Sequence, residues 1–212
     1  MDAKQHVEIR VDAEGRLIVP PEVARRLGFT PGVTVHADLN GQGLQIRQTI
    51  HRLSKVYIEP TTHCNLTCRT CIRNVWDEPM GQMSGSTFAR IMDGLGAVTP
   101  PQKVFFGGFG EPLFHPEIVE MINQAKGRGA AVELITNGTL LDEQRSRQLI
   151  AAGLDVLWVS LDGARPESYA DVRLGAALPT VIENIERFRS LRPTAQLPSP
   201  DIGIVFVAMA RN

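Results

Sequence analysis

The sequence predicts an α/β fold built on a parallel sheet, preceded by a small β-rich domain. From Lys55 onward, short β-type runs alternate with longer stretches of helical character, which is the pattern of βα units around a parallel sheet. The first fifty residues instead carry two pairs of short β-type runs on either side of one short helical stretch. We therefore expect two domains, residues 1–50 and residues 51–212.

The composition is that of an ordinary globular protein. With 43% hydrophobic and 21% charged residues, the chain falls outside the disordered and collagen-like classes. It has no run of about 18 apolar residues, and the N-terminus lacks the basic and apolar stretches of a secretory signal. We expect a cytoplasmic protein with no membrane partner. The net charge of -1 gives no overall attraction to nucleic acid.

In the first domain, β-type runs at 7–11 and 17–19 flank a turn-prone segment, and Pro20 and Pro21 then open a short helix that Gly28 ends. A second pair of runs, 33–39 and 44–47, is joined by Asn-Gly-Gln-Gly, which is a hairpin signal. A unit of this size buries little core by itself. We therefore expect it to dimerise or to dock onto the second domain.

Residues 11–20 and 27–32 resemble the AbrB/MazE-type swapped-hairpin family, and the resemblance covers about Gln5 to Gln48. That family consists largely of dimeric DNA-binding regulators and antitoxins, so the resemblance implies a homodimer and raises DNA binding as an alternative. The acidic residues of the segment equal its basic residues in number. Because phosphate binding draws on uncompensated positive charge, this balance favours dimerisation or partner docking over DNA binding.

In the second domain, five strands and four helices are expected in alternation. The strands are 56–59, 103–106, 132–135, 155–160 and 202–208, and the helices lie near 86–94, 116–128, 142–152 and 178–190. In such folds the chemistry lies in the loops that follow the strands. The chain ends soon after the fifth strand, so we expect a sixth strand and a C-terminal region to be missing.

The three cysteines, Cys64, Cys68 and Cys71, follow the first strand with Cys-x3-Cys-x2-Cys spacing. An odd number of cysteines at such short spacing does not form a disulfide framework. Three thiolates can hold three corners of an iron-sulfur cubane and leave the fourth iron open for another ligand. The alternatives are zinc, with His63 or a remote histidine as the fourth ligand, and a redox dithiol. Zinc is less favoured because His63 is adjacent to Cys64, and the dithiol because it does not open a helix.

The later strands end in polar and glycine-rich loops. The second strand leads into residues 107–112, where glycines allow close approach of the backbone to a ligand and Glu111 offers an acceptor for an amino group. Thr136-Asn137-Gly138 and Ser160-Leu161-Asp162-Gly163 follow the next two strands. Their side chains can bind a ribose or a carboxylate, or they can simply cap helices and form turns. Arg173 can pair with a carboxylate or remain solvated.

With these motifs in this order, the chain resembles the radical SAM superfamily from about Lys55 to Asn212. The resemblance implies a partial (β/α)6 barrel whose 4Fe-4S cluster, on Cys64, Cys68 and Cys71, binds S-adenosylmethionine at its open iron. It also implies a set of cofactor contacts: Gly108, Gly110 and Glu111 at the amino group, the Thr136-Asn137 motif, Ser160, Asp162 and Arg173 at the ribose and carboxylate, and Thr70 near the adenine. Reduced flavodoxin or ferredoxin would supply an electron, and a 5'-deoxyadenosyl radical would abstract hydrogen from a substrate in an enclosed, oxygen-free site.

Residues 68–83 resemble the radical SAM proteins that modify the cofactor of tungsten-containing aldehyde:ferredoxin oxidoreductases. This resemblance implies maturation of a tungsten or molybdenum pterin cofactor or its oxidoreductase. It places Arg69, Arg73 and Trp76 at the mouth of the site, although Arg73 and Trp76 can instead simply pack the cysteine loop. Two other functions stay open, a SPASM-type peptide or protein maturase and a DNA-binding, redox-responsive regulator.

Overall fold

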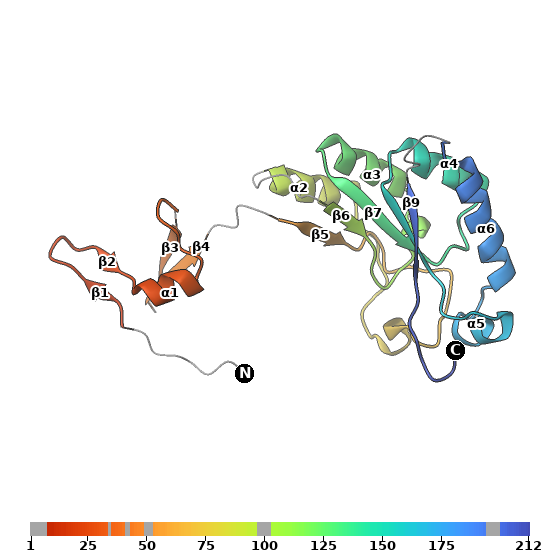
Figure 1. Ribbon diagram of the computed structural model, residues 1–212, viewed down its shortest axis with the longest axis horizontal. Helices are drawn as coiled ribbons and strands as arrows, with labels where there is room; N and C mark the ends of the chain where they lie inside the picture. The colour runs from red at the N-terminus through yellow and green to blue at the C-terminus, as the bar shows by residue number, and fades with distance from the viewer. Residues whose placement is uncertain (1–7, 34, 41–42, 49–52, 97–102, 194–199) are drawn as a thin grey trace. The chain divides into compact units, whose positions relative to one another are not determined.

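The computed structural model describes residues 8–33, 35–40, 43–48, 53–96, 103–193 and 200–212. It divides the chain into two compact units, Met1–His51 and Arg52–Asn212, which are described separately. Figure 1 shows the short strands and helix of the first unit and the larger sheet and helices of the second.

The first unit contains two antiparallel hairpins and a short helix. Strand β1 (Arg10–Val11) pairs with β2 (Leu17–Ile18), and the turn between them is held by Asp12, whose Oδ1 accepts the backbone N–H groups of Glu14 and Arg16. Helix α1 (Pro21–Arg26) follows, with proline at its first position as predicted. The second hairpin pairs β3 (Val35–Asn40) with β4 (Gly43–Gln48), whereas residues 41–42 of its expected turn lie outside the described residues.

The second unit is built on a five-stranded parallel sheet, which confirms the predicted α/β fold class. In spatial order its strands are β5 (Lys55–Ile58), β6 (Lys103–Phe106), β7 (Ala131–Thr136), β8 (Val156–Ser160) and β9 (Asp201–Val205). The helices between them are α2 (Gly85–Gly96), α3 (Ile118–Gly127), α4 (Glu143–Ala151), α5 (Pro166–Val172) and α6 (Leu178–Leu191). Figure 1 shows α2, α3, α4 and α6 arranged along the sheet.

The core lies between the helices and one face of the sheet. Because successive side chains of a strand point to opposite faces, Val104 and Phe106 of β6 and Leu134 of β7 share this face, and each is at most 1% exposed. They belong to one apolar cluster with helix residues such as Phe88 and Leu149. Burying side chains of this size contributes about 1.5–3 kcal/mol each. The cluster therefore fixes the sheet on which the strand-end loops stand.

An ion cluster lies on the other face of the sheet. The Glu133 carboxylate of β7 accepts hydrogen bonds from Lys55 Nζ (2.9 Å), Lys103 Nζ (2.9 Å) and Trp158 Nε1 (3.2 Å). Burial alone would raise the pKa of Glu133, but these donors outweigh it and lower the pKa to about 2. The cluster joins side chains of β5, β6, β7 and β8 on this face of the sheet.

Three short elements and one strand end differ from the expectation. Helix α5 and the 3-10 turns η1 (Ile72–Val75) and η2 (Pro112–Phe114) were not predicted. Strand β9 ends at Val205 instead of residue 208, because Val207 donates its backbone N–H to Asp162 Oδ1 (3.0 Å) rather than continuing the ladder. Within the described part of the chain, no helix has the length and apolarity needed to span a bilayer.

Candidate cluster and cofactor site

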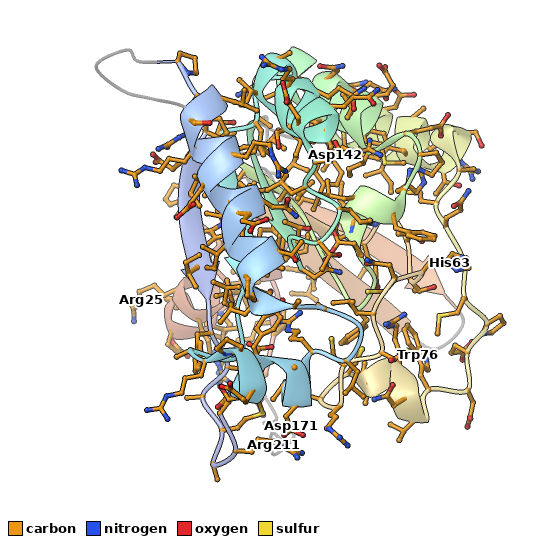
Figure 2. The ribbon with its side chains drawn as sticks, turned by 90° about the vertical axis from the view of Figure 1, so that its right-hand side faces the viewer. Arg25, His63, Trp76, Asp142, Asp171 and Arg211 are labelled. Atoms are coloured by element: carbon orange, nitrogen blue, oxygen red, sulfur yellow. The ribbon has the colours of Figure 1, made fainter. Side chains whose placement is uncertain are left out.

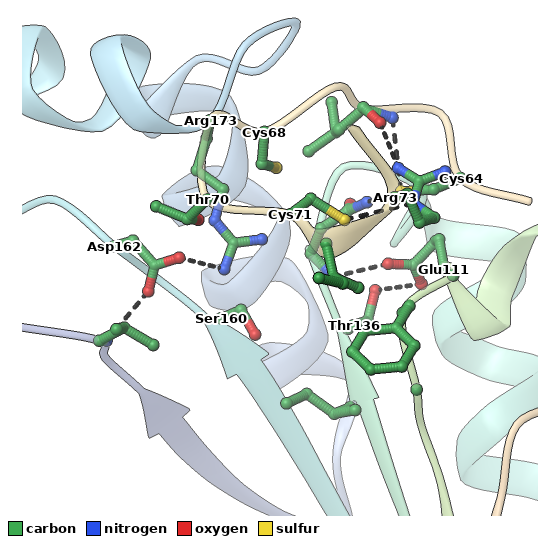
Figure 3. A pocket seen from close by; sticks show the side chains of 18 residues that line it. Cys64, Cys68, Thr70, Cys71, Arg73, Glu111, Thr136, Ser160, Asp162 and Arg173 are labelled. Carbon is green, nitrogen blue, oxygen red and sulfur yellow. Dashed lines mark hydrogen bonds and ion pairs between the residues drawn. The ribbon is translucent and has the colours of Figure 1, made fainter. Parts of the chain in front are cut away.

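A pocket of about 310 Å³ lies at the carboxyl ends of the parallel strands (Figure 3). The loops after β5, β6, β7 and β8 all contribute to its wall, as expected for a βα sheet. The structure brings every residue predicted as a cluster ligand or cofactor contact to this one pocket: Cys64, Cys68, Thr70, Cys71, Gly108, Gly110, Glu111, Thr136, Asn137, Ser160, Asp162 and Arg173.

The cysteine loop is closed at its base by hydrogen bonds between its two ends. Thr61 Oγ1 donates to the carbonyl of Gly81 (2.9 Å), and Gly81 N–H donates to Thr62 Oγ1 (2.7 Å). The backbone N–H of Met83 donates to the carbonyl of Pro60 (2.7 Å). Both ends of the loop are thereby anchored at the end of β5. The three cysteines between them are held beside the pocket.

The thiols are free and half-buried, and two of them receive hydrogen bonds. Cys64 Sγ accepts from the backbone N–H of Leu66 (3.4 Å) and from Asn137 Nδ2 (3.8 Å), and Cys71 Sγ accepts from Arg73 Nε (3.3 Å). Burial raises the pKa of Cys64 and of Cys68, which favours the protonated thiol over the thiolate.

The glycine-rich loop after β6 packs directly against the cysteine loop. A side chain on Gly110 would run into the carbonyl oxygen of Thr61, and one on Gly108, whose φ is 151°, would collide with Glu59. The Glu59 carboxylate accepts the backbone N–H groups of Phe109 (2.6 Å) and Gly110 (3.1 Å). The absence of side chains at Gly108 and Gly110 therefore lets the backbone of this loop approach both the cysteine loop and the pocket.

Glu111 links the loop after β6 to the end of β7 by hydrogen bonds. It is 2% exposed, and its carboxylate accepts hydrogen bonds from Thr136 Oγ1 (2.7 Å), the N–H of Asn137 (2.7 Å) and the N–H of Leu113 (3.0 Å). Burial raises its pKa, and the hydrogen bonds partly oppose that rise. The sequence suggested Glu111 as an acceptor for a ligand amino group. In the structure its carboxylate already serves three protein donors.

On the opposite wall, Arg173 and Asp162 form an ion pair, with Arg173 Nη2 2.6 Å from Asp162 Oδ2. The side chain of Arg173 is 13% exposed and that of Asp162 is 5% exposed. Asp162 thereby fixes the orientation of the guanidinium. Arg173 Nε is buried and has no hydrogen-bond partner in the described part of the chain. A buried N–H without a partner is costly, so this wall suits an anionic ligand group such as a carboxylate.

The donor set fits an iron-sulfur cluster. Three free thiols lie on one loop, and N–H groups donate to two of the sulfurs, which are the ligands and hydrogen bonds that such clusters use. In the described ranges, no group of three or more His, Cys, Asp and Glu side chains is gathered to hold a single metal ion, whereas the cysteines of a cubane each bind a different iron.

Comparison with known proteins identifies the family. Residues 58–197 match the model of the Radical SAM superfamily. The chain belongs to the radical SAM superfamily. Because this family uses a 4Fe-4S cluster and S-adenosylmethionine, the two cofactors implied by the resemblance are confirmed over the zinc alternative.

The radical SAM chain is similar to curated proteins and to solved structures, among them the following two relatives and one structure. A "tungsten-containing aldehyde ferredoxin oxidoreductase cofactor-modifying protein" of Pyrococcus furiosus is 33% identical over 158 residues, covering 74% of this chain and 44% of the relative. An "AdoMet-dependent heme synthase" of Methanosarcina barkeri is 32% identical over 133 residues, covering 62% and 38%. The structure of native anSMEcpe with bound AdoMet shares the fold, with a TM-score of 0.58 and 21% identity over 71% of this chain and 43% of that one. The radical SAM chain thus spans less than half the length of these relatives.

Two radical SAM site predictions need correction. Arg69 and Trp76, expected at the mouth, do not line the pocket, whereas Arg73 does. Arg69 turns toward Asp171, with Nε 2.7 Å from its carbonyl oxygen, and Figure 2 shows Asp171 next to Arg211, with which it also pairs (2.8 Å). The Trp76 ring packs edge-on against Phe109, with centroids 5.6 Å apart. Trp76 therefore has a packing role, which was the alternative to a place at the mouth of the site.

Glu59 and Phe109 were not predicted as site residues. Phe109 lines the radical SAM pocket, and Glu59 holds the backbone of the glycine-rich loop. A weak signal existed for each, because Glu59 directly follows the first strand and Phe109 is the one large residue among glycines. Neither signal points to a contact between segments fifty residues apart.

Proposed function

We propose that this protein reductively cleaves S-adenosylmethionine at a 4Fe-4S cluster held by Cys64, Cys68 and Cys71. The observation that carries the proposal is the meeting of three free thiols with every strand-end motif on the wall of one pocket. When bound, the cluster would supply the electron that breaks the sulfonium bond. Reduced flavodoxin or ferredoxin is the proposed electron donor. The cytoplasm, where thiols stay reduced, is the proposed compartment.

The residues around the pocket would bind and orient the cofactor. Backbone groups of Gly108 and Gly110 would approach its amino group, while Glu111 keeps their loop fastened to β7. Arg173, oriented by Asp162, would use its unpartnered Nε to bind the carboxylate. Four other pocket residues complete the proposed contacts, with Ser160, Thr136 and Asn137 toward the ribose and the backbone of Thr70 toward the adenine.

Apolar side chains would keep water from the reacting atoms. Leu66, Ile72, Phe109, Ile135 and Val207 line the same pocket between its polar groups. A radical formed there needs protection from solvent and from side reactions, and apolar walls provide it. The chain's own contribution to the step is therefore positioning and enclosure.

For the target, we propose maturation of a tungsten or molybdenum pterin cofactor, or of the oxidoreductase that carries it. The support is the Pyrococcus furiosus relative, whose name describes modification of the cofactor of a tungsten-containing oxidoreductase. A SPASM-type maturase is the alternative. It would act on a peptide or protein.

The test is anaerobic reconstitution with iron and sulfide, followed by dithionite and S-adenosylmethionine and chromatographic detection of 5'-deoxyadenosine. The wild type should form it, and a Cys68→Ala variant should not. Adding the tungsten oxidoreductase or a pterin substrate should raise the rate above the uncoupled rate. No increase with either would remove the proposed target, and an increase with a peptide substrate would favour the maturase.

We further propose that the first unit forms a homodimer. Among its residues with described exposure none is buried, and seven large apolar side chains are at least 37% exposed: Ile9, Val11, Leu17, Ile18, Leu27, Val35 and Leu44. Apolar surface on so small a unit favours a second copy as its cover. DNA binding is less favoured, because Arg16 is already paired with Asp12 and Glu14, each at 2.7 Å.

The dimer is tested by light scattering of the intact chain. The wild type should have twice the mass of one chain, and Ile18→Glu should shift it toward the monomer. A wild type that stays monomeric at high concentration would contradict the dimer. DNA binding that weakens steeply with salt would instead support the regulator.

A further inference from the structure

We infer that Arg73 is a positioning residue that raises the reduction potential of the cluster by holding a fixed positive charge against Cys71. The inference rests on the proposed function, because it concerns the same cluster. It adds a role for one side chain that neither the cysteine spacing nor the strand-end motifs assign.

The guanidinium of Arg73 is fixed by three contacts to the cysteine loop, and Figure 3 shows it beside Cys71. Nε donates to Cys71 Sγ (3.3 Å), Nη2 donates to the carbonyl of Leu66 (2.7 Å), and Nη1 donates to the carbonyl of Thr62 (3.4 Å). The acceptors come from the beginning, the middle and the end of the cysteine motif. Because the guanidinium is planar, three acceptors around its rim fix its plane as well as its position.

The charge of Arg73 is directed at the thiols and at no carboxylate. Within the described residues its hydrogen-bond acceptors are two carbonyl oxygens and one sulfur. The other arginine of the pocket, Arg173, faces Asp162 at 2.6 Å, so much of its charge is neutralised within the wall. Arg73 is therefore the pocket cation whose field acts most fully on the cluster ligands.

The position of this charge determines the sign of the effect. One electron passes from a reduced donor, which is oxidised, to the cluster, which gains one unit of negative charge. A fixed cation and an N–H donor at a ligand sulfur both stabilise the more negative state. Since Arg73 is partly buried on the pocket wall, water and salt screen it less than they screen a surface charge. The reduced cluster should thus be easier to form with Arg73 than without it.

Arg69 supplies a matched control. It also carries a positive charge on the cysteine loop, directly after Cys68, but its Nε lies 3.3 Å from Asp171 Oδ1 and its side chain is 48% exposed. Within the described residues, Arg69 donates no hydrogen bond to a sulfur. Removing its charge tests the effect of any nearby cation, whereas removing that of Arg73 tests the fixed contact with Cys71.

The experiment is a potentiometric titration followed by electron paramagnetic resonance on the reconstituted chain and on the variants R73Q, R73K and R69Q, after iron and sulfide have been measured in each. R73Q should make reduction about tenfold less favourable, which for one electron lowers the midpoint potential by about 59 mV. R73K, which keeps the charge and loses the planar contacts, should lie between R73Q and the wild type. R69Q should stay near the wild type.

The outcomes separate the inference from the proposed function. Clusters that assemble in every variant, with a shift in R73Q no larger than in R69Q, would overturn the inference and leave the proposed function standing. Loss of the cluster from both Arg73 variants but not from R69Q would make Arg73 a structural residue and also overturn it. A wild type that assembles no cluster would remove both.

Discussion

Gly110 lies where the glycine-rich loop and the cysteine loop meet, and no other residue fits there. Its own N–H is held by Glu59, and the N–H of the following residue, Glu111, donates to the carbonyl of His63 (2.8 Å). Since a methyl group on Gly110 would run into the backbone of Thr61, one of the two loops would have to move. The loops carry the cysteines and the proposed cofactor contacts, so a shift here would alter both.

We therefore expect Gly110→Ala to weaken iron binding by the reconstituted chain by about 2 kcal/mol, within the range of about 1–3 kcal/mol that local backbone strain costs. Gly81→Ala is the control, because Gly81 lies at the end of the cysteine loop that Gly110 contacts and has open space around it. Iron bound per chain under limiting iron is the measurement. Equal iron in the two variants would show that the contact with Thr61 does not matter.

For single residues, the sequence predicted well which of them lie at the site. It predicted less well which contacts each of them makes there. Strand-end motifs meet because parallel strands end at one edge, which is a property of the topology. Three contacts depend instead on how separate loops pack against one another. They are the hydrogen bonds of Glu111 to the end of β7, those of Glu59 to the glycine-rich loop, and the contact between Arg73 and Cys71. Those contacts come from the fold, and no local pattern carries them.

Among the elements, strands β5 to β8 followed their sequence patterns closely, because each has at least one buried apolar residue in the core. The shorter elements did not. Helix α5 has seven residues and buries only Tyr169 and Val172, so its pattern is too short to stand out. The end of β9 was set by the hydrogen bond from Val207 to Asp162, a tertiary contact that local β propensity does not register.

The ion cluster of Glu133 gives the sheet a pH-dependent stability. The pKa is about 2 in the folded chain and ordinarily 4.5, so the stabilisation is present above about pH 4.5 and is lost as the pH falls toward 2. Glu133→Gln should lower the free energy of unfolding at pH 7 by about 3 kcal/mol, the low end of the range for breaking a buried ion pair, because Lys103 is 51% exposed. It should also flatten the decline below pH 4.5.

Urea unfolding of the apo chain at pH 7 and at steps down to pH 2.5 measures both effects. Glu143→Gln is the control, because Glu143 pairs with Arg147 on the surface of α4, and such pairs contribute at most about 1 kcal/mol. A Glu133→Gln variant with wild-type stability and an unchanged acid slope would contradict the role assigned to the ion cluster.

On the scale of the whole molecule, the second unit carries the loops of the pocket on a sheet of five parallel strands. The chain nevertheless spans only 44% of the Pyrococcus furiosus relative. The sequence predicted the βα architecture because its periodicity is local and repeated. The pocket residues bear on the cofactor chemistry, whereas the proposed target rests on the name of the Pyrococcus furiosus relative.

The most direct test of the account is the electron paramagnetic resonance spectrum of the dithionite-reduced chain before and after addition of S-adenosylmethionine. Three cysteine ligands leave one iron of a 4Fe-4S cluster without a protein ligand. If the cofactor binds that iron, the spectrum of the reduced cluster should change when it is added. A spectrum that stays the same, or a chain that holds one zinc ion and no iron, would contradict the account.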